Sequence, residues 1–269
     1  GVGDKPAALR RLEGAVRANP RDLALRANLA EGYLSAGEAQ KAQAVVRDAP
    51  PDLANAPRLL LARGRAELSL REWSNAVATF DQLVRVQPES AGPQLQLATA
   101  LAGAGNITGM EQHLLEGVKI DPDNPLVPVA IGSVVGALGD TIAKAALVDK
   151  LTEVMPGHPQ LALAQAQVAM DGGDYAKAIK GLHSLYKTRP KDPAVFEALL
   201  RAQVAANDLM PAAGTAEDWL KTHPHDDRVR AKLAQIYLSH GDRDNAVKAY
   251  REILKRSPDD PAALNNLAM

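Results

Sequence analysis

The residue types that do chemistry in proteins occur in this chain at spacings that point away from catalysis. His223, His225 and Asp226 stand together, and two imidazoles with a carboxylate can bind a divalent metal. They lack the helical His-x-x-x-His spacing, and no thiolate accompanies them, because the chain has no cysteine. We therefore expect a loop with incidental histidines and no metal site. Without cysteine, disulfides and cysteine nucleophiles are excluded as well.

Two glycine-rich segments resemble ligand-binding loops only in part. Gly103–Gly109 lacks the Gly-Lys-Ser/Thr ending of a phosphate-binding loop, and it follows a helical pattern rather than a strand. Asp171–Asp174 offers too few oxygen ligands for calcium and has no glutamate at the far end. No Gly-x-Ser-x-Gly elbow occurs. We predict that the chain is not an enzyme and needs no cofactor.

Composition narrows the classes of partner. Of 269 residues, 46% are hydrophobic and only 3% aromatic, and 31 Lys and Arg face 32 Asp and Glu, for a formal net charge of −1. A nucleic-acid binder would need a basic surplus, so we expect no nucleic-acid partner. No apolar run approaches the roughly 18 residues needed to span a bilayer, which predicts no transmembrane segment. The start in mid-repeat at Gly1, without a visible signal peptide, suggests an excised segment.

The elements that carry these residues follow a strict period. Six prolines recur every 34 residues, namely Pro88, Pro122, Pro156, Pro190, Pro224 and Pro258. Pro20 lies two periods before Pro88. A fixed period of this length predicts an array in which each unit is one helix pair stacked on its neighbours. Such arrays bind other macromolecules along extended surfaces and rarely do chemistry.

Each period also carries signals for helix ends. One repeat position holds residues that tolerate the left-handed conformation closing a helix, namely Gly37, Gly105, Gly139, Gly173, Asn207 and Gly241. Another holds the prolines that suit a first helical residue, namely Pro57, Pro125, Pro159, Pro193 and Pro261. We expect helices of about 13 and about 15 residues in each unit.

The pattern resembles the tetratricopeptide repeat (TPR) family. The unit 227–260 fits best, with Leu233, Ala234, Tyr237, Gly241, Ala246, Tyr250 and Pro258 at family positions 7, 8, 11, 15, 20, 24 and 32. The resemblance implies an all-α fold, a right-handed superhelical solenoid of antiparallel helix pairs.

We number each unit so that its proline is position 32. This numbering divides the whole chain into full and truncated repeats. Residues 1–22 contain the second helix of a truncated repeat. Residues 261–269 start a further truncated repeat. Between them lie seven full units at 23–56, 57–90, 91–124, 125–158, 159–192, 193–226 and 227–260.

Three irregularities interrupt the pattern. Pro50 and Pro51 come early in the first full unit, where Ala54 takes the proline position, so its second helix should stop short and the superhelical pitch should change around 50–57. Arg71 occupies the glycine position of the next unit. Pro128 lies at the fourth position of its helix, where we expect it to tighten the first turn.

The family resemblance implies where a partner would bind. TPR proteins line their concave surface mainly with the first helix of each unit, at positions 2, 5, 9, 12 and 13. The chain lacks the lysines and asparagines with which TPR co-chaperones clamp a C-terminal carboxylate. Its groove combines an apolar floor with a few charges, which suits an extended or helical partner segment. The candidate groove residues are Arg58, Leu61, Arg65, Leu95, Thr99, Val129, Leu163, Gln167, Met170, Glu197, Arg201, Arg228 and Gln235.

These observations favour a protein-interaction scaffold. The Ala/Leu-rich repeats and the segment Pro261–Ala268 resemble bacterial TPR lipoproteins of PEP-CTERM and exopolysaccharide export systems, which implies a periplasmic or outer-membrane-associated protein. The alternatives are a cytoplasmic scaffold, the regulatory TPR segment of a larger enzyme such as a glycosyltransferase, or a scaffold that binds polysaccharide directly. Direct polysaccharide binding calls for exposed aromatic platforms, whereas we expect Trp73 and Trp219 to be core residues.

Overall fold

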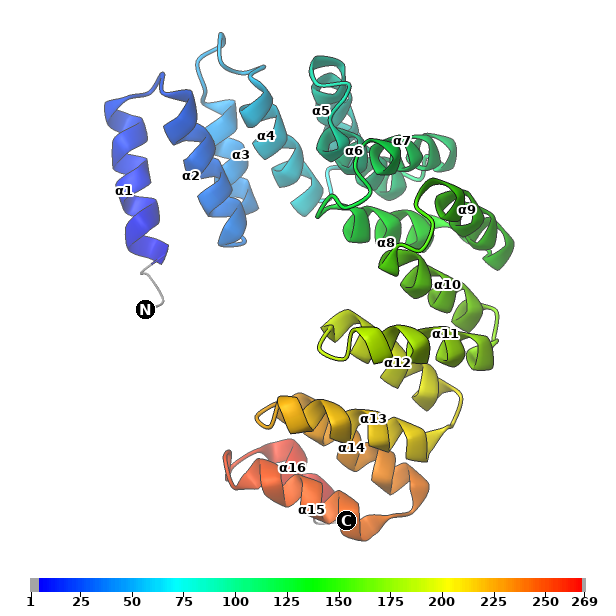
Figure 1. Ribbon diagram of the computed structural model, residues 1–269. Coiled ribbons are helices and arrows are strands. Elements are labelled where there is room, and N and C mark those ends of the chain that lie inside the picture. Colours follow the sequence, from blue (N-terminus) through cyan, green and yellow to red (C-terminus); the bar gives the residue numbers. More distant parts are fainter. Residues whose placement is uncertain (1–4, 268–269) are drawn as a thin grey trace. The chain divides into compact units, whose positions relative to one another are not determined.

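The computed structural model describes residues 5–267, and expectations for residues 1–4, 268 and 269 lie outside that range. Within it the chain forms 16 helices and no strand (Figure 1). This confirms the predicted all-α array of helix pairs. The chain divides into two compact units, unit 1 up to Gly157 and unit 2 from His158 onward.

Unit 1 is built from nine helices within its described residues. Neighbouring helices pack against each other in chain order from α1 to α8, while α9 packs against α7 and not closely against α8. Their bounds are α1 Lys5–Ala18, α2 Leu23–Ser35, α3 Ala39–Arg47, α4 Pro57–Ser69, α5 Trp73–Val86, α6 Ala91–Gly103, α7 Ile107–Ile120, α8 Val127–Ala137 and α9 Thr141–Val154.

Unit 2 contains the remaining seven helices of the described chain, and each packs against the next. Their bounds are α10 Pro159–Asp171, α11 Tyr175–Thr188, α12 Pro193–Ala205, α13 Leu209–Thr222, α14 Asp227–His240, α15 Arg243–Leu254 and α16 Pro261–Leu267. The division of the chain into 34-residue units remains a prediction from the sequence.

The helix-closing position behaves as predicted in most of the chain. Four glycines and Asn207 adopt positive φ there, and Arg71 does so at φ 59°. The glycines are Gly37, Gly105, Gly173 and Gly241. The prediction is wrong for Gly139, which is not among the positive-φ residues. Helix α8 instead ends through an extended Leu138, with φ −72° and ψ 127°, and this geometry buries the Leu138 side chain.

Arg71 is strained because a side chain with a Cβ atom is disfavoured in the left-handed region by about 1–2 kcal/mol. Its side chain is exposed, so little contact is lost by removing it. We expect Arg71→Gly to raise the free energy of unfolding by about 1 kcal/mol in urea titrations followed by circular dichroism. Asn207→Gly is the matched control and should change it by less, because asparagine tolerates this conformation. A loss of stability in Arg71→Gly would contradict the assignment.

The two prolines at 50 and 51 shorten a helix as predicted. Helix α3 has nine residues and ends at Arg47, whereas α5 has 14. The chain then runs through turns from 48 to 56 before α4 begins. The expected change of pitch around 50–57 remains a prediction.

Pro128 acts differently from our expectation. Helix α8 begins at Val127 rather than at Pro125, so Pro128 becomes the second helical residue. At the fourth position a proline would lack the N–H that bonds the helix start, and its ring would crowd the preceding turn. Moving the start by two residues removes both problems, so this proline displaces the helix start instead of tightening the first turn.

The core depends on small residues that let helices approach closely. Gly64 in α4 lies against the fully buried ring of Phe80 in α5, and Gly103 in α6 lies against Trp73. In unit 2 the ring of Trp219 stacks on the buried Phe196, with their centroids 4.2 Å apart. Trp219 is therefore a core residue, as expected, and Trp73 is half-buried against its glycine.

A polar contact recurs between successive helix pairs. The buried Tyr33 hydroxyl donates to Glu13, and the buried Tyr237 hydroxyl donates to Glu217, with the same spacing of 20 residues. Burial, followed by the hydrogen bond and the negative charge of the glutamate, raises the pKa of each tyrosine to about 12. Since the ordinary tyrosine pKa is about 10, both phenols are held neutral in the folded chain.

The raised pKa of Tyr237 makes stability depend on alkaline pH. A group whose pKa is higher in the folded state stabilises the fold fully below its unfolded pKa, about 10, and loses that contribution as pH rises through about 12. We expect phenolate absorbance to rise together with loss of helical circular dichroism in this range. Glu217→Gln should shift the ionisation of Tyr237 to lower pH, and Glu13→Gln should do the same for Tyr33. Ionisation of all five tyrosines near pH 10 with the helices intact would contradict this.

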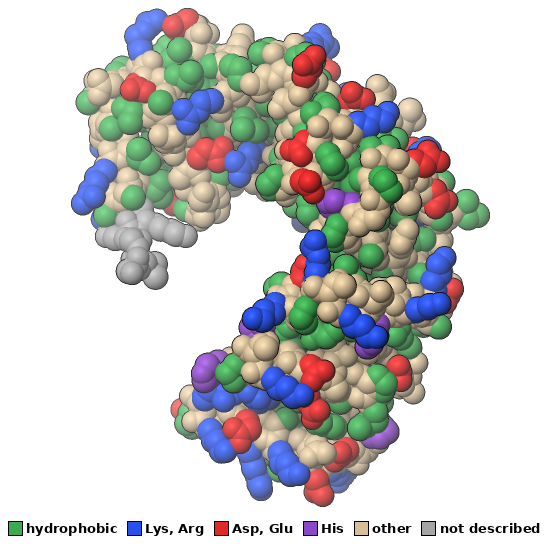
Figure 2. All heavy atoms as spheres, viewed as in Figure 1, with side chains coloured by type: hydrophobic (Ala, Val, Ile, Leu, Met, Phe, Trp, Pro, Cys, Tyr) green, Lys and Arg blue, Asp and Glu red, His purple; other side chains and the backbone are tan. Residues whose placement is uncertain are grey.

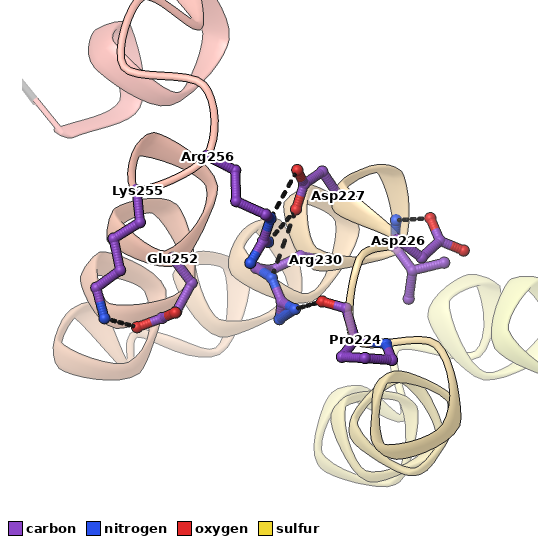
Figure 3. A network of polar contacts seen from close by, with 8 residues as sticks. Pro224, Asp226, Asp227, Arg230, Glu252, Lys255 and Arg256 are labelled. Carbon is purple, nitrogen blue, oxygen red and sulfur yellow. Dashed lines mark hydrogen bonds and ion pairs between the residues drawn. The ribbon is translucent and has the colours of Figure 1, made fainter.

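An ionic network joins the start of α14 to the turn that follows α15 (Figure 3). The Asp227 carboxylate accepts hydrogen bonds from Arg256, lies 3.7 Å from Arg230 Nε, and Arg230 in turn donates to the Pro224 carbonyl. The hydrogen bond from Arg256 lowers the pKa of Asp227 despite partial burial. The neighbouring Asp226 caps α14 through the Val229 N–H. The turn after Pro224 is thereby fixed at both ends.

Candidate protein-binding groove

A groove in unit 2 opens between α12 and α14. These two helices do not pack closely, and neither do α4 and α6, whereas the pairs α2–α4 and α6–α8 do. The groove has a volume of about 620 Å³. It is lined by Ala194, Glu197, Ala198, Leu200, Arg201, Val204, Ala205, Leu209, Lys232, Gln235, Ile236 and Ser239.

The groove has an apolar floor and an exposed apolar rim. Leu200 and Ile236 are buried and form part of the floor. Val204 remains 43% exposed, which is unusual for a branched aliphatic side chain. Removing such a side chain from water contributes about 1.5–3 kcal/mol when the burial is complete. An apolar side chain of a partner that covers Val204 would therefore contribute favourable binding free energy.

Glu197 is the acidic residue of the groove, and two basic side chains of α14 pair with its carboxylate. Lys232 Nζ lies 2.9 Å from Glu197 Oε2, and Arg228 forms an ion pair with Oε1. Burial opposes ionisation, but the hydrogen bonds from Lys232 and Arg228 outweigh it and lower the pKa of Glu197 below its ordinary value. The carboxylate stays ionised, and the ion pairs tie α12 to α14 across the groove.

Arg201 carries a positive charge that no carboxylate of the described chain pairs with directly. Its Nη2 donates to Gln167 Oε1 at 2.7 Å, and Gln167 Nε2 donates to Asp171 Oδ1 at 2.6 Å. The neutral amide orients the guanidinium without cancelling its charge. With Lys232 and Arg228 facing a single Glu197, the groove has a surplus of positive charge.

The predicted groove residues of unit 2 are placed as follows. Glu197, Arg201 and Gln235 line the groove, Arg228 pairs with Glu197, and Gln167 holds Arg201. Leu163 and Met170 are half-buried and pack on the hydrophobic core between α10, α11 and α12. Those two lie mainly in the core.

Among the predicted residues of unit 1, the two arginines are already engaged with other side chains. Arg65 pairs with Glu31 at 2.5 Å, and Arg58 donates to Asn28 at 2.9 Å. Leu61 is half-buried, Val129 is 59% exposed, and Thr99 donates to the Leu95 carbonyl.

Leu95 is fully buried, so its side chain cannot contact a partner, contrary to the groove prediction. The reason is local, because α6 is enclosed by α5, α7 and α8 on several sides. The same repeat position is half-buried in Leu61 and exposed in Val129.

Sequence reasoning missed part of the groove. Lys232, Ala194 and Ser239 line it, as does Val204, none of which was among the candidates. Lys232 could have been found from its separation of 35 residues from Glu197 along the sequence, which is one period and one residue. This separation places the two opposite charges on the first helices of neighbouring repeats.

The histidine cluster and the buried tryptophan lie together at the end of α13. The His223 ring stacks on Trp219 at 3.9 Å, and residues 5–267 contain no group of three His, Cys, Asp or Glu side chains placed to hold a metal. Trp219 is only 5% exposed, so its ring offers no exposed platform for a sugar. Figure 2 shows acidic and basic side chains interspersed on the face in view. Among the described helices none is long and apolar enough to cross a membrane.

Comparisons with known proteins agree with this architecture. Three family models, each described as tetratricopeptide repeat, match residues 3–66, 61–125 and 227–269. No curated protein matches by sequence.

Solved structures show the fold. Yeast Tom70 is 15% identical with a TM-score of 0.65 over 98% of this chain, which spans only 57% of the Tom70 chain. A tetratricopeptide repeat protein from Parabacteroides merdae is 17% identical with a TM-score of 0.56, covering 99% of this chain and 92% of that one. PilW, a type IV pilus biogenesis factor, is 16% identical with a TM-score of 0.56, covering 91% and 98%. The helix pairs, the left-handed turns and the matched repeats show that the chain is a tetratricopeptide repeat protein.

Proposed function

We propose that the protein is a scaffold that binds an acidic, amphipathic segment of a partner protein in the groove between α12 and α14. The observation that carries this proposal is the combination of an exposed Val204 with the unneutralised Arg201 one helical turn away. Residues three apart on a helix lie on one face, so one partner segment can reach both.

Each half of the groove contributes a different kind of binding energy. An apolar partner side chain over Val204 and the Leu200–Ile236 floor would be removed from water. A partner carboxylate on Arg201 would form a charge-assisted and often bidentate hydrogen bond. The floor supplies affinity and the charges supply specificity and orientation. Arginine at the edge of an apolar pocket is typical of residues that dominate interfaces.

Site-specific photo-crosslinking in the protein's own cells tests the proposal. A benzophenone amino acid at Val204 should capture a partner protein, identified by mass spectrometry, through a segment that carries Asp or Glu. Met210 is the matched control, since it is 48% exposed on α13 and does not line the groove. Arg201→Glu, introduced into the variant that carries the benzophenone amino acid at position 204, should abolish the crosslinked adduct. Equal adducts at both positions, or none at Val204, would overturn the proposal.

We also propose a bacterial envelope export system as the setting, at the periplasmic or outer-membrane side. Its support is the sequence resemblance of the Ala/Leu-rich repeats and of the segment Pro261–Ala268 to TPR lipoproteins. Cell fractionation of the full-length protein tests it, and recovery in the cytoplasm would refute it. In that case a cytoplasmic scaffold or the regulatory segment of a larger enzyme becomes the better proposal.

A further inference from the structure

Helix α11 carries basic side chains and no acidic ones. Lys177, Lys180 and Lys187 are all exposed, and neither aspartate nor glutamate occurs between Tyr175 and Thr188. The chain as a whole has nearly equal numbers of basic and acidic residues, 31 Lys and Arg against 32 Asp and Glu. No carboxylate of the described chain forms an ion pair with any of the three lysines. The exposed face of α11 therefore keeps its positive charge.

Comparison with α13 and α15 shows why Lys187 stays unpaired. Lysines recur at a spacing of 34 residues at the ends of the three helices, namely Lys187, Lys221 and Lys255. Lys221 Nζ lies 2.7 Å from Asp218 Oδ1, and Lys255 pairs in the same way with Glu252, in each case three positions earlier. In α11 this earlier position is Ser184, which carries no charge. The carboxylate that the chain supplies in α13 and α15 is thus missing from α11.

The exposed face of α11 is hollowed on two sides. A cavity of about 330 Å³ lies between α10 and α11, and one of about 760 Å³ lies between α11 and the turn that joins α12 to α13. Lys180 and Ser184 line both cavities. Among the described residues that line them the only carboxylate is Asp208, which forms no ion pair with Lys180 or Lys187. Both cavities therefore have an excess of positive charge.

The remaining lining of the two cavities favours a polypeptide ligand over a nucleic acid. No Phe, Tyr or Trp occurs among the described residues that line them, whereas single-stranded nucleic acids are bound by stacking on such rings. Ala162 and Ala166 in the smaller cavity, and Ala176 and Ile179 in the larger, leave room for apolar side chains of a ligand. The equivalent lysines of α13 and α15 are paired with carboxylates, which indicates the kind of group that α11 lacks.

We propose that the exposed face of α11 is a second interaction surface, which binds an acidic segment of a partner protein. Carboxylates of that segment would pair with Lys180 and Lys187, as Asp218 pairs with Lys221. Lys180 and Lys187 lie two helical turns apart, which is about 10 Å along the helix axis. An extended segment advances about 3.3 Å per residue, so acidic residues three positions apart match this spacing. The surface is independent of the groove between α12 and α14, because neither lysine lines that groove.

Fluorescence anisotropy with a labelled oligo-glutamate peptide at low ionic strength tests the proposal. All measurements use the protein with Arg201→Glu, so that the groove between α12 and α14 does not contribute to binding. We expect saturable binding of the peptide. Lys180→Gln combined with Lys187→Gln should weaken that binding by about fivefold or more, because two ion pairs are lost.

Two sets of control variants separate the surface of α11 from the net charge of the protein. Lys248→Gln combined with Lys255→Gln removes the same charge from α15, where Lys255 is already paired with Glu252, and should leave binding unchanged. Ser184→Glu supplies the carboxylate that α15 has at the equivalent position, so it should weaken binding as the lysine substitutions do. Ser184→Gln, which adds no charge, should leave binding unchanged.

Three outcomes would overturn the proposal. The first is the absence of saturable oligo-glutamate binding, whether or not inorganic polyphosphate binds. The second is equal weakening by the two pairs of lysine substitutions, because the peptide would then respond to net charge alone. The third is unchanged binding in Ser184→Glu. Circular dichroism checks that each variant is folded, which we expect because all the substituted side chains are exposed.

Discussion

Replacing Phe196 with alanine should lower the free energy of unfolding by about 3–5 kcal/mol, the largest effect we expect from a single substitution in this protein. Phe196 is fully buried in α12 and stacks on Trp219 with centroids 4.2 Å apart. Its removal leaves a cavity in the core that joins α12, α13 and α14. Urea titration followed by circular dichroism measures the loss.

Phe196→Leu is the control because it keeps much of the volume and should cost less than half as much. Repeat units contact only their neighbours, so hydrogen exchange should show the loss of protection concentrated in α12–α14. A loss below about 1 kcal/mol for Phe196→Ala would mean that the ring is not part of a packed core.

The second large effect is a pair of glycine substitutions with opposite signs. A Cβ atom on Gly64 would lie 2.6 Å from the Phe80 ring, and that ring is fully buried and cannot move aside. We expect Gly64→Ala to cost about 1–3 kcal/mol through overpacking. Gly181, in the middle of α11, has nothing within 4 Å of such an atom. Gly181→Ala should therefore add about 0.5–1 kcal/mol through helix propensity.

Thermal and urea unfolding of both variants measure the pair. Their opposite signs separate close helix contact from the general cost of glycine in a helix. If both substitutions stabilise the protein, α4 and α5 do not approach each other as closely as the structure has them.

The regular parts of this fold could be predicted because they depend on local chemistry. A left-handed turn needs glycine or asparagine, and a helix start tolerates proline, so the ends of most helices follow from single residues. The exceptions arise where tertiary packing outweighs that chemistry. Arg71 is held at positive φ without being glycine, and Gly139 is not used because burying Leu138 favours an extended turn.

The candidate groove could be predicted only in part. Repeat position identified Glu197, Arg201 and Gln235, because it fixes which face of a helix a residue occupies. It could not show that α12 and α14 stand apart while α6 is enclosed, since that depends on the volumes of many side chains together. Leu95 was therefore misplaced and Lys232 was missed.

Selection of random peptides on the purified protein tests most directly whether the groove between α12 and α14 binds protein segments. We predict enrichment of peptides that combine Asp or Glu with apolar residues three or four positions apart. That enrichment should disappear with Val204→Asp and with Arg201→Glu, and it should persist with Met210→Asp. Peptides without acidic residues, or enrichment that survives both groove substitutions, would contradict the proposal.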